Sequence, residues 1–257
     1  MRNPTLGLLS LLIGCACCSI ASRTNGGAVP TTRPTMSEAQ EPHILHVLKE
    51  AESSTGIHRL GYDADGKLTS IFLSSAIAND DNIRALSAVS EVTCIRVSGS
   101  WSGISAEALG ELRHLKHLER LELRYANRRV TMDFGMALAR ITSLRTLTIT
   151  GSEMDLAAAN FLCALPNLTT LQLKSTRDLT DANVVALAQL AQLEELDLSY
   201  TGISNASLDV LATLPHLKRL SVFGTKVTEE GVLQSKLAGK VAVQGAKFKT
   251  VSNPQDS

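Results

Sequence analysis

The sequence lacks an excess of charge of either sign and has few aromatic residues. Its 257 residues carry 25 basic and 25 acidic side chains, and aromatic residues make up 4% of the chain. Neutral balance argues against nucleic acid or an anionic membrane surface as an electrostatic partner. Because rings are scarce, we expect aliphatic side chains to fill the core. With 44% hydrophobic residues, a chain of this length can bury a continuous core.

Catalytic motifs are also missing. Gly99–Gly103 resembles a nucleophile elbow superficially, but Trp101 stands where the G-x-S-x-G pattern needs serine. The sequence has no glycine-rich phosphate loop followed by Lys-Ser/Thr. Two histidine pairs have metal-ligand spacing but no third ligand in obvious reach: His43/His46 and His114/His117. We therefore predict no enzyme activity, no metal site and no cofactor.

What the sequence does have is a repeat of 24–26 residues. In the copy from Leu193 to Leu217, leucines at L-x-x-L-x-L spacing predict a short strand, and leucines three residues apart predict a helix after a turn. A unit this small cannot bury its own apolar face, so the copies must stack. The first apolar position recurs at Leu68, Val92, Leu118, Leu144, Leu168, Leu193 and Leu217.

This pattern resembles the leucine-rich-repeat family over about Leu68–Leu237, and most of all its secreted bacterial members, whose repeats read L-x-x-L-x-L-x-x-T-x-I-T. The resemblance implies an α/β solenoid of about seven repeats, with a parallel sheet on the concave side and helices on the convex side. It does not imply a specific activity.

Two further positions of the repeat support the same alignment of its copies. The ninth position often carries a small hydroxyl residue, as at Thr201 and Thr225, which can bond the backbone of the turn. Each expected helix is preceded by a strong N-cap former. These residues are Asn79, Ser105, Thr131, Asp155, Thr180, Ser204 and Thr228.

Residues 1–14 are predicted to be a signal peptide. Arg2 supplies a short positive region, and the apolar run Leu6–Ile13 is too short to span a bilayer. Leu12-Ile13-Gly14-Cys15 resembles the bacterial lipobox, which implies cleavage before Cys15 and lipidation of that cysteine. The protein would then be exported and attached to the outer side of the cytoplasmic membrane or to the outer membrane. An ordinary cleaved signal with chance cysteines is the alternative.

The rest of the chain is expected to have four parts. Residues 15–40, rich in Thr, Pro and Gly, form a lipid-anchored flexible tether. Residues 41–67 form a helix and hairpin that cap the apolar edge of the first repeat. Residues 68–237 hold the repeats, and residues 238–257 hold a closing strand and a tail.

Strand alternation places the residues between the ladder leucines on the concave face. Neighbours in a row lie on adjacent strands, so opposite charges in one row are expected to neutralise each other. The predicted pairs are Arg96–Glu122, Glu195–Arg219, Glu119–Arg145 and Glu194–Lys218. The middle repeats should offer an uncharged polar surface made of Thr146, Thr148, Thr150, Thr170 and Gln172.

The candidate binding site is a patch on one rim of the solenoid. The two longest turns are adjacent, at Ser100–Gly103 and Asn127–Arg129, and they carry residue types that are enriched at interface hot spots. The alternative is that the tryptophan folds down onto its loop and the arginines are solvated. The predicted members of the patch are Trp101, Arg124, Tyr125, Arg128 and Arg129.

These observations favour a monomeric, membrane-anchored, exported module for protein–protein interaction. The protein partner cannot be read from the sequence, because a fold does not fix a function. The alternative is a structural or envelope-organising lipoprotein without a discrete partner.

Overall fold

A computed structural model describes residues 43–55, 59–125 and 129–247 of the chain. All of these described residues belong to one compact unit. The predicted signal peptide, tether and lipidated Cys15 lie outside the described residues, as does the predicted tail after residue 247.

The described chain begins with a helix and a hairpin. Helix α1 (His43–Thr55) is followed by strand β1 (Leu60–Tyr62), which pairs antiparallel with β2 (Leu68–Ser74). The carboxylate of Asp63 closes the turn by accepting the backbone N–H groups of Asp65 and Lys67, at 3.0 and 2.8 Å. These elements occupy the segment in which the sequence predicts a cap.

From β2 onward the sheet is parallel. The register is unbroken, because the fourth residue of each repeat lies opposite the fourth residue of the next. This row consists of Ile71, Ile95, Leu121, Leu147, Leu171, Leu196 and Leu220, and it confirms the predicted phase. The further strands are β3 (Cys94–Ser98), β4 (Arg120–Arg124), β6 (Thr146–Thr150), β8 (Thr170–Gln172), β9 (Glu195–Asp197), β10 (Arg219–Ser221) and β11 (Ala242–Gln244).

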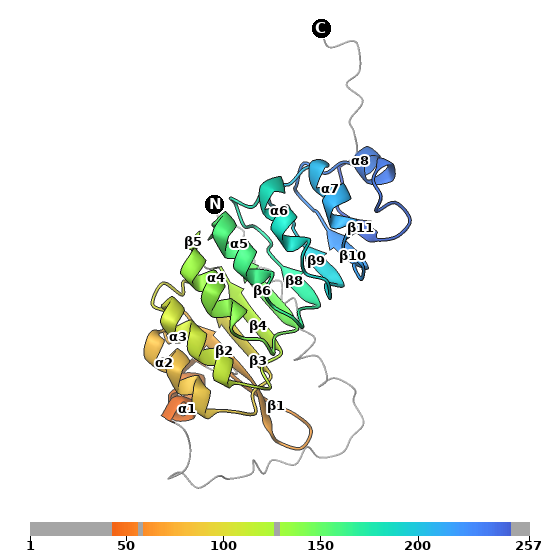
Figure 1. Cartoon of the computed structure of the whole chain (residues 1–257). Coiled ribbons are helices and arrows are strands. Elements are labelled where there is room, and N and C mark those ends of the chain that lie inside the picture. The colour runs from red at the N-terminus through yellow and green to blue at the C-terminus, as the bar shows by residue number, and fades with distance from the viewer. Residues whose placement is uncertain (1–42, 56–58, 126–128, 248–257) are drawn as a thin grey trace, which may run out of the picture. The chain divides into compact units, whose positions relative to one another are not determined.

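One short helix follows each repeat strand, and the helices lie side by side over one face of the sheet (Figure 1). Two of them continue into 3-10 turns, at Leu86–Ala88 and Glu111–His114. The helices are α2 (Asp80–Ala85), α3 (Ala106–Gly110), α4 (Met132–Ala139), α5 (Leu156–Leu162), α6 (Asp181–Leu187), α7 (Ala206–Leu211) and α8 (Glu229–Gln234). On one rim, β5 (Arg129–Val130) and β7 (Glu153–Met154) form a second, two-stranded parallel sheet.

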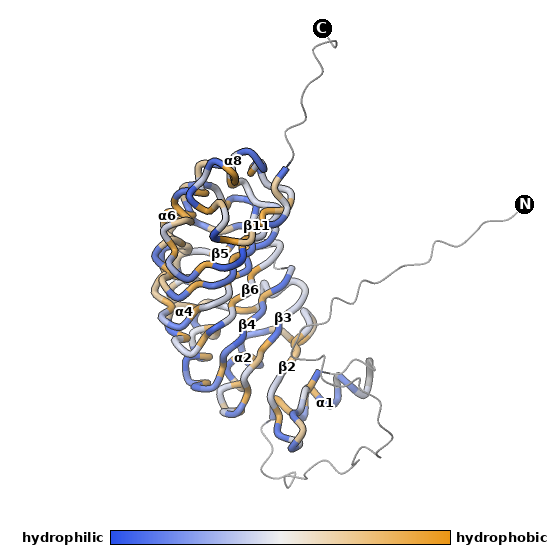
Figure 2. Tube along the Cα trace, turned by 90° about the vertical axis from the view of Figure 1, so that its right-hand side faces the viewer, coloured by the Kyte–Doolittle hydropathy of each residue, from blue (hydrophilic) through white to orange (hydrophobic). Residues whose placement is uncertain are grey.

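Strand and helix leucines meet in one hydrophobic cluster that extends from Ile44 on α1 to Leu237 after α8. Hydrophobic and hydrophilic stretches alternate along the chain within each repeat (Figure 2), which is the pattern that such a layered core requires. Because each repeat shares its buried face with its neighbours, no repeat has a core of its own.

The helix N-termini confirm several predicted caps and link consecutive repeats. The side chains of Asn79, Ser105 and Thr228 each accept a backbone N–H from the first turn of their helices. Asp80 at the start of α2 also accepts the backbone N–H and the hydroxyl of Ser105 in the next repeat, at 2.6 and 2.8 Å. The cap of one helix is thereby fixed by the helix before it.

A second link of this kind holds the start of α7. Asp181 on α6 accepts the backbone N–H and the hydroxyl of Ser204, at 2.8 and 2.7 Å, and also the hydroxyl of Ser207. The predicted cap Ser204 is therefore held against the preceding repeat. The Ser204 hydroxyl oxygen still accepts the Ala206 N–H at 3.2 Å, as an N-cap does, whereas Asn205, which directly precedes α7, has a helical backbone and makes no side-chain cap bond.

From the second repeat onward, the position two residues after the last apolar ladder residue has a left-handed backbone. Glycine occupies it at Gly99, Gly151 and Gly224, with φ of 89°, 65° and 66°. Three side-chain-bearing residues adopt the same conformation, although it is unfavourable for any residue with a Cβ. They are Tyr125, Ser175 and Tyr200, with φ of 57°, 59° and 58°.

Candidate partner-binding site

The rim patch that the sequence predicts does not form around Trp101. Its side chain is 1% exposed, and the ring packs against Phe134 on α4 with the centroids 5.4 Å apart. The turn closes over it through a hydrogen bond from the Ile104 N–H to the Trp101 carbonyl, at 3.0 Å. The placement of Trp101 on an exposed edge is therefore wrong. The lengthened turn instead contributes Trp101 to the core, which agrees with the alternative that the tryptophan folds down onto its loop.

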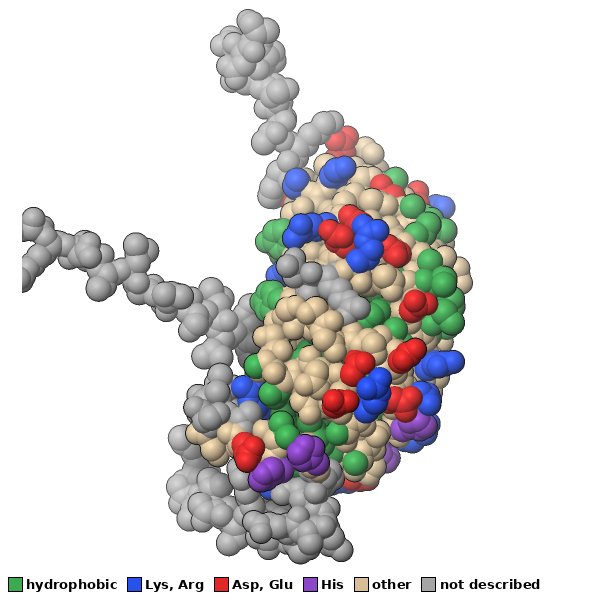
Figure 3. All heavy atoms as spheres, turned by 90° about the vertical axis from the view of Figure 1, so that its left-hand side faces the viewer, with side chains coloured by type: hydrophobic (Ala, Val, Ile, Leu, Met, Phe, Trp, Pro, Cys, Tyr) green, Lys and Arg blue, Asp and Glu red, His purple; other side chains and the backbone are tan. Residues whose placement is uncertain are grey.

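The arginines of the predicted patch contact carboxylates. Arg129 reaches Glu153, Asp155 and Asp178, at 3.4, 3.1 and 3.1 Å, and these charges raise its pKa. Asp155 and Asp178 belong to the two following repeats, so Arg129 ties three turns together. Acidic and basic side chains lie beside one another on the face of the molecule that holds β5 (Figure 3), so their charges largely cancel there.

The other predicted members have separate environments. Arg124 is half-buried and lies 3.0 Å from Glu122, whereas Tyr125 is 67% exposed and Arg128 lies outside the described residues. Among the described members, Tyr125 is thus the one that presents a largely free aromatic surface.

The ion pairs predicted along the sheet are confirmed. Glu119 contacts Arg145 at 3.6 Å, and Glu194 contacts Lys218 at 2.8 Å. The pair Arg219–Glu195 also forms, as does Arg96–Glu122 at 2.8 Å. In the last pair the Glu122 side chain is almost completely buried between the Nε atoms of Arg96 and Arg124.

The threonine surface is smaller than predicted. Thr146 and Thr148 are buried, and the Thr148 hydroxyl donates to the Gln172 side chain at 3.2 Å. Thr150, Thr170 and Gln172 remain partly exposed. The accessible polar surface therefore begins further toward the C-terminus than the sequence pattern suggests.

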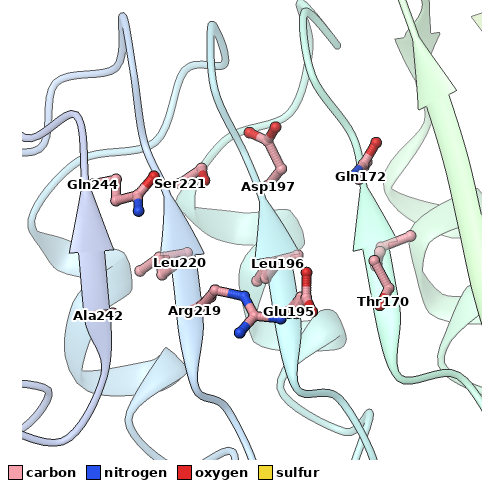
Figure 4. A pocket seen from close by; sticks show the side chains of 11 residues that line it. Thr170, Gln172, Glu195, Leu196, Asp197, Arg219, Leu220, Ser221, Ala242 and Gln244 are labelled. Atoms are coloured by element: carbon pink, nitrogen blue, oxygen red, sulfur yellow. Dashed lines mark hydrogen bonds and ion pairs between the residues drawn. The ribbon is translucent and has the colours of Figure 1, made fainter. Parts of the chain in front are cut away.

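A hollow lies there, on the concave face between β8 and β11. One row of its wall is Thr170, Glu195, Arg219 and Ala242, and the next row is Gln172, Asp197, Ser221 and Gln244. Arg219 reaches across to β9 toward Glu195, and Asp197 and Gln172 stand on adjacent strands (Figure 4). One Asp197 oxygen accepts the Ser199 N–H at 2.9 Å. The hollow therefore presents amide, hydroxyl and carboxylate groups, with two carboxylates, Glu195 and Asp197, against one guanidinium, Arg219.

Exposed aromatic rings border this hollow, at the ends of the strands. Tyr200 is 55% exposed and Phe223 is 47% exposed, and the Tyr200 N–H bonds the Phe223 carbonyl at 2.6 Å. The ammonium of Lys174 lies 5.3 Å from the centre of the Tyr200 ring. We call Lys174, Tyr200 and Phe223 the aromatic edge.

Each ring of the aromatic edge lies over a glycine that follows the next strand of the sheet. A Cβ on Gly224 would lie 2.5 Å from Tyr200 Cδ1, and a Cβ on Gly245 would lie 2.5 Å from Phe223 Cγ. These residues were not predicted as a site from the sequence. A detectable signal was present, because Tyr200 and Gly224 occupy the same position of consecutive repeats.

The described part of the chain holds no group of three or more His, Cys, Asp and Glu side chains arranged to bind a metal. Burial raises the pKa of the Cys163 thiol to about 11, so this thiol is a poor nucleophile at neutral pH. None of the described helices is both long and apolar enough to cross a membrane.

Residues 166–227, which include the hollow's strands β8, β9 and β10, match the family model of the leucine rich repeat. Comparison with the curated proteins finds no match.

Among solved structures, the chain is similar to three internalins from Listeria monocytogenes. Internalin InlF is 20% identical with a TM-score of 0.41, over 64% of this chain and 51% of that one. Internalin C2 is 16% identical with a TM-score of 0.47, over 84% and 100%. InlP is 15% identical with a TM-score of 0.42, over 71% and 53%. The chain thus spans about half the length of InlF and of InlP.

Proposed function

From the premise that the chain is a leucine-rich-repeat protein, we propose that it is an exported protein-binding module. In this proposal a lipid on Cys15 holds the module at a membrane, and the module acts as a monomer and without catalysis. Leucine-rich-repeat folds commonly mediate protein–protein interaction, and the lipobox-like Leu12–Cys15 supports the anchor. Two or more acyl chains on one residue would make such attachment stable.

The observation that carries the binding function is the aromatic edge beside the hollow. Soluble proteins rarely leave adjacent large rings exposed without a function, and tyrosine is enriched at interface hot spots. The rings are closely packed on one side, because each lies against the glycine that follows the next strand. The hollow beside them supplies side chains that can donate or accept hydrogen bonds to a partner. Tyr125 is a further aromatic contact in this proposal.

Capture of the partner in intact cells tests the proposal. A photo-crosslinking amino acid at Gln244 would label a protein that lies over the hollow. Tyr200→Ala combined with Phe223→Ala should reduce the yield of this crosslink about tenfold or more, as loss of hot-spot residues does.

Two exposed apolar residues on the helix side give a matched control. Val185 on α6 and Leu156 on α5 are 59% and 49% exposed, and Val185→Ala with Leu156→Ala should leave the crosslink unchanged. Equal yields for the two double variants would contradict a site at the aromatic edge. If the Gln244 crosslink does not saturate with partner concentration, the alternative of a structural lipoprotein without a discrete partner is favoured.

A further inference from the structure

Carboxylates on the concave face are typically paired with a cation of the neighbouring repeat. Four of them contact an arginine or a lysine there, namely Glu119, Glu122, Glu194 and Glu195. Asp197 on β9 differs from these four. Among the residues that the structure describes, no arginine, lysine or histidine lies within ion-pair distance of its carboxylate.

The cause is the row of the sheet in which Asp197 stands. It is directly paired with Gln172 on β8 and with Ser221 on β10. Both neighbours are uncharged, so the register places no cation beside this carboxylate. The Arg219 guanidinium stands one row away and is engaged by Glu195. The Asp197 carboxylate lies between Gln172 and Ser221, apart from that ion pair (Figure 4).

Hydrogen bonds orient the Asp197 carboxylate and connect it to the aromatic edge. One carboxylate oxygen accepts the Ser199 N–H at 2.9 Å, and the other accepts no hydrogen bond from the described part of the chain. The Ser199 hydroxyl in turn accepts the Phe223 N–H at 3.2 Å. A single residue therefore links the carboxylate to the backbone of Phe223, whose ring is 47% exposed.

Asp197 lines the hollow between β8 and β11, in which two carboxylates face one guanidinium. Its side chain is half-buried, so a partner can reach it and part of its hydration is already lost. The field of an unbalanced charge is stronger in a concave site than on an open surface. Covering this carboxylate without a counter-charge would be unfavourable. A partner that lies over the hollow must therefore supply a cation.

We propose that the protein partner inserts an arginine side chain into the hollow, with its guanidinium on the Asp197 carboxylate and its aliphatic stem toward Phe223. The inference rests on the proposed function and adds the chemistry of the partner segment. A planar guanidinium has several N–H donors, so it can bond the carboxylate together with the side-chain oxygens of Gln172 and Ser221. The apolar stem of an arginine packs well on an exposed ring.

A peptide titration tests the site without the natural partner. The probe is a fluorescein-labelled decapeptide of arginine and glycine, titrated with the full chain and followed by fluorescence anisotropy. We expect saturable binding that weakens as sodium chloride rises from about 20 to 200 mM, because salt screens the charges. The matching lysine–glycine peptide should bind about threefold more weakly, since an ammonium makes fewer directed hydrogen bonds. A glutamate–glycine peptide should not bind.

Two matched variants localise the binding. Asp197→Asn removes the charge but keeps an oxygen for the Ser199 N–H, and it should weaken the affinity for the arginine peptide about tenfold. Asp133→Asn makes the same change at an exposed residue in the first turn of α4, on the helix side. This control should bind as wild type does. Circular dichroism melting shows whether each variant is folded.

A further variant keeps the test decisive if Asp197→Asn does not fold. Ser221→Lys places an ammonium beside Asp197 on the next strand, so the site would be occupied from within the chain. The affinity for the arginine peptide should again fall about tenfold. Ser98→Lys adds the same charge to β3, outside the hollow, and should have little effect. Unchanged affinity in a folded Ser221→Lys variant would contradict the proposed contact.

Two other results would overturn the inference. One is equal weakening by Asp133→Asn and Asp197→Asn, which would mean that net charge alone attracts the peptide. The other is displacement of the peptide by spermidine at the same concentration, which would identify a small polycation as the ligand.

The titration and the Gln244 crosslink separate this inference from the proposed function. If the crosslink captures a partner but Asp197→Asn changes neither measurement, the binding function stands and the arginine contact is wrong. If the arginine peptide binds as expected but no crosslink forms, the hollow has the proposed chemistry and the proposed partner-binding function is wrong.

Discussion

Trp101 and Phe134 pack together across two consecutive repeats, with their ring planes inclined by 49°. Trp101 comes from the turn after β3, and Phe134 comes from the first turn of α4. The contact explains why a turn longer than its counterparts is compatible with a stable solenoid. The extra residues let a large ring reach the space between two helices, where it buries area that a shorter turn leaves unfilled.

Truncation of this contact should destabilise the protein. Trp101→Ala is expected to lower the free energy of unfolding by about 3–5 kcal/mol, the usual range for loss of a buried large aromatic side chain. Thermal denaturation followed by circular dichroism measures the effect. The control is Tyr125→Ala, which alters an exposed ring and should change stability by about 0.5 kcal/mol or less. Equal melting temperatures for the two variants would mean that Trp101 is not a core residue.

The glycine beneath Tyr200 gives a second prediction. Gly224→Ala should destabilise the protein because its φ is +66° and the added Cβ would meet the tyrosine ring. Gly239→Ala is the matched control: its φ is +72°, but no atom lies within 4 Å of an added Cβ. This control should show the left-handed backbone penalty alone, about 1–2 kcal/mol.

The clash can be separated from the backbone penalty in a double-mutant cycle. In a Tyr200→Ala background, the loss caused by Gly224→Ala should fall to that of Gly239→Ala, because the ring is gone. Chemical denaturation of the four proteins gives the free energies. If the loss is the same with and without the ring, Tyr200 does not rest on Gly224.

The link between α6 and α7 should make stability depend on pH. Burial raises the pKa of Asp181, but hydrogen bonds from Ser207 and Ser204, together with the charge of Lys226, outweigh it, and the pKa is lowered overall. A carboxyl whose pKa is lower in the folded state stabilises the protein fully above its unfolded pKa, near 4. This stabilisation is lost as the pH falls through the folded value.

Denaturant unfolding at several pH values between about 6 and 3 tests this sign. Wild type should lose more stability over that interval than Asp181→Asn, in which the titrating group is absent. Ser207→Ala removes one donor and should retain an intermediate dependence. If acidification destabilises Asp181→Asn as much as wild type, the pH dependence comes from other groups.

The lipid anchor is tested separately from binding. Cys15→Ser removes the sulfur that would carry the lipid, so the protein should leave the membrane fraction or fail to mature. Fractionation and the mass of the mature N-terminus are the measurements. A control substitution, Cys17→Ser, should leave the fractionation unchanged and should alter the N-terminal mass only by the exchange of sulfur for oxygen. Membrane retention of Cys15→Ser with an unchanged N-terminal mass would show that the lipobox resemblance is accidental.

The sequence predicted the sheet well because its period is strict. Residues such as Ile71 and Leu220 are far apart in the chain, yet the apolar spacing places both in one row of the sheet. The ion pairs followed from the same register, since Arg96 and Glu122 needed only to be neighbours in a row. The spacing of the apolar residues does not predict that Thr146 and Thr148 are buried on the concave face.

The turns could not be predicted in this way. Trp101 has the composition of an interface residue, and only the position of Phe134 in the next repeat determines that it packs inward. Ser204 caps α7 as predicted, but its hydrogen bonds to Asp181 have no counterpart in the spacing of the repeat. In each case the deciding partner lies one repeat away and outside the periodic positions, so spacing alone carries no information about it.

The unbroken register also has a consequence for the rate and order of folding. Each parallel strand pairs with the next one along the chain, so Leu121 meets Leu147 and Leu147 meets Leu171 after the closure of short loops only. Low contact order favours rapid folding, and arrays of this kind can nucleate at any adjacent pair and extend in both directions. The first repeats can therefore fold before the last repeats of the chain are available to pair with them.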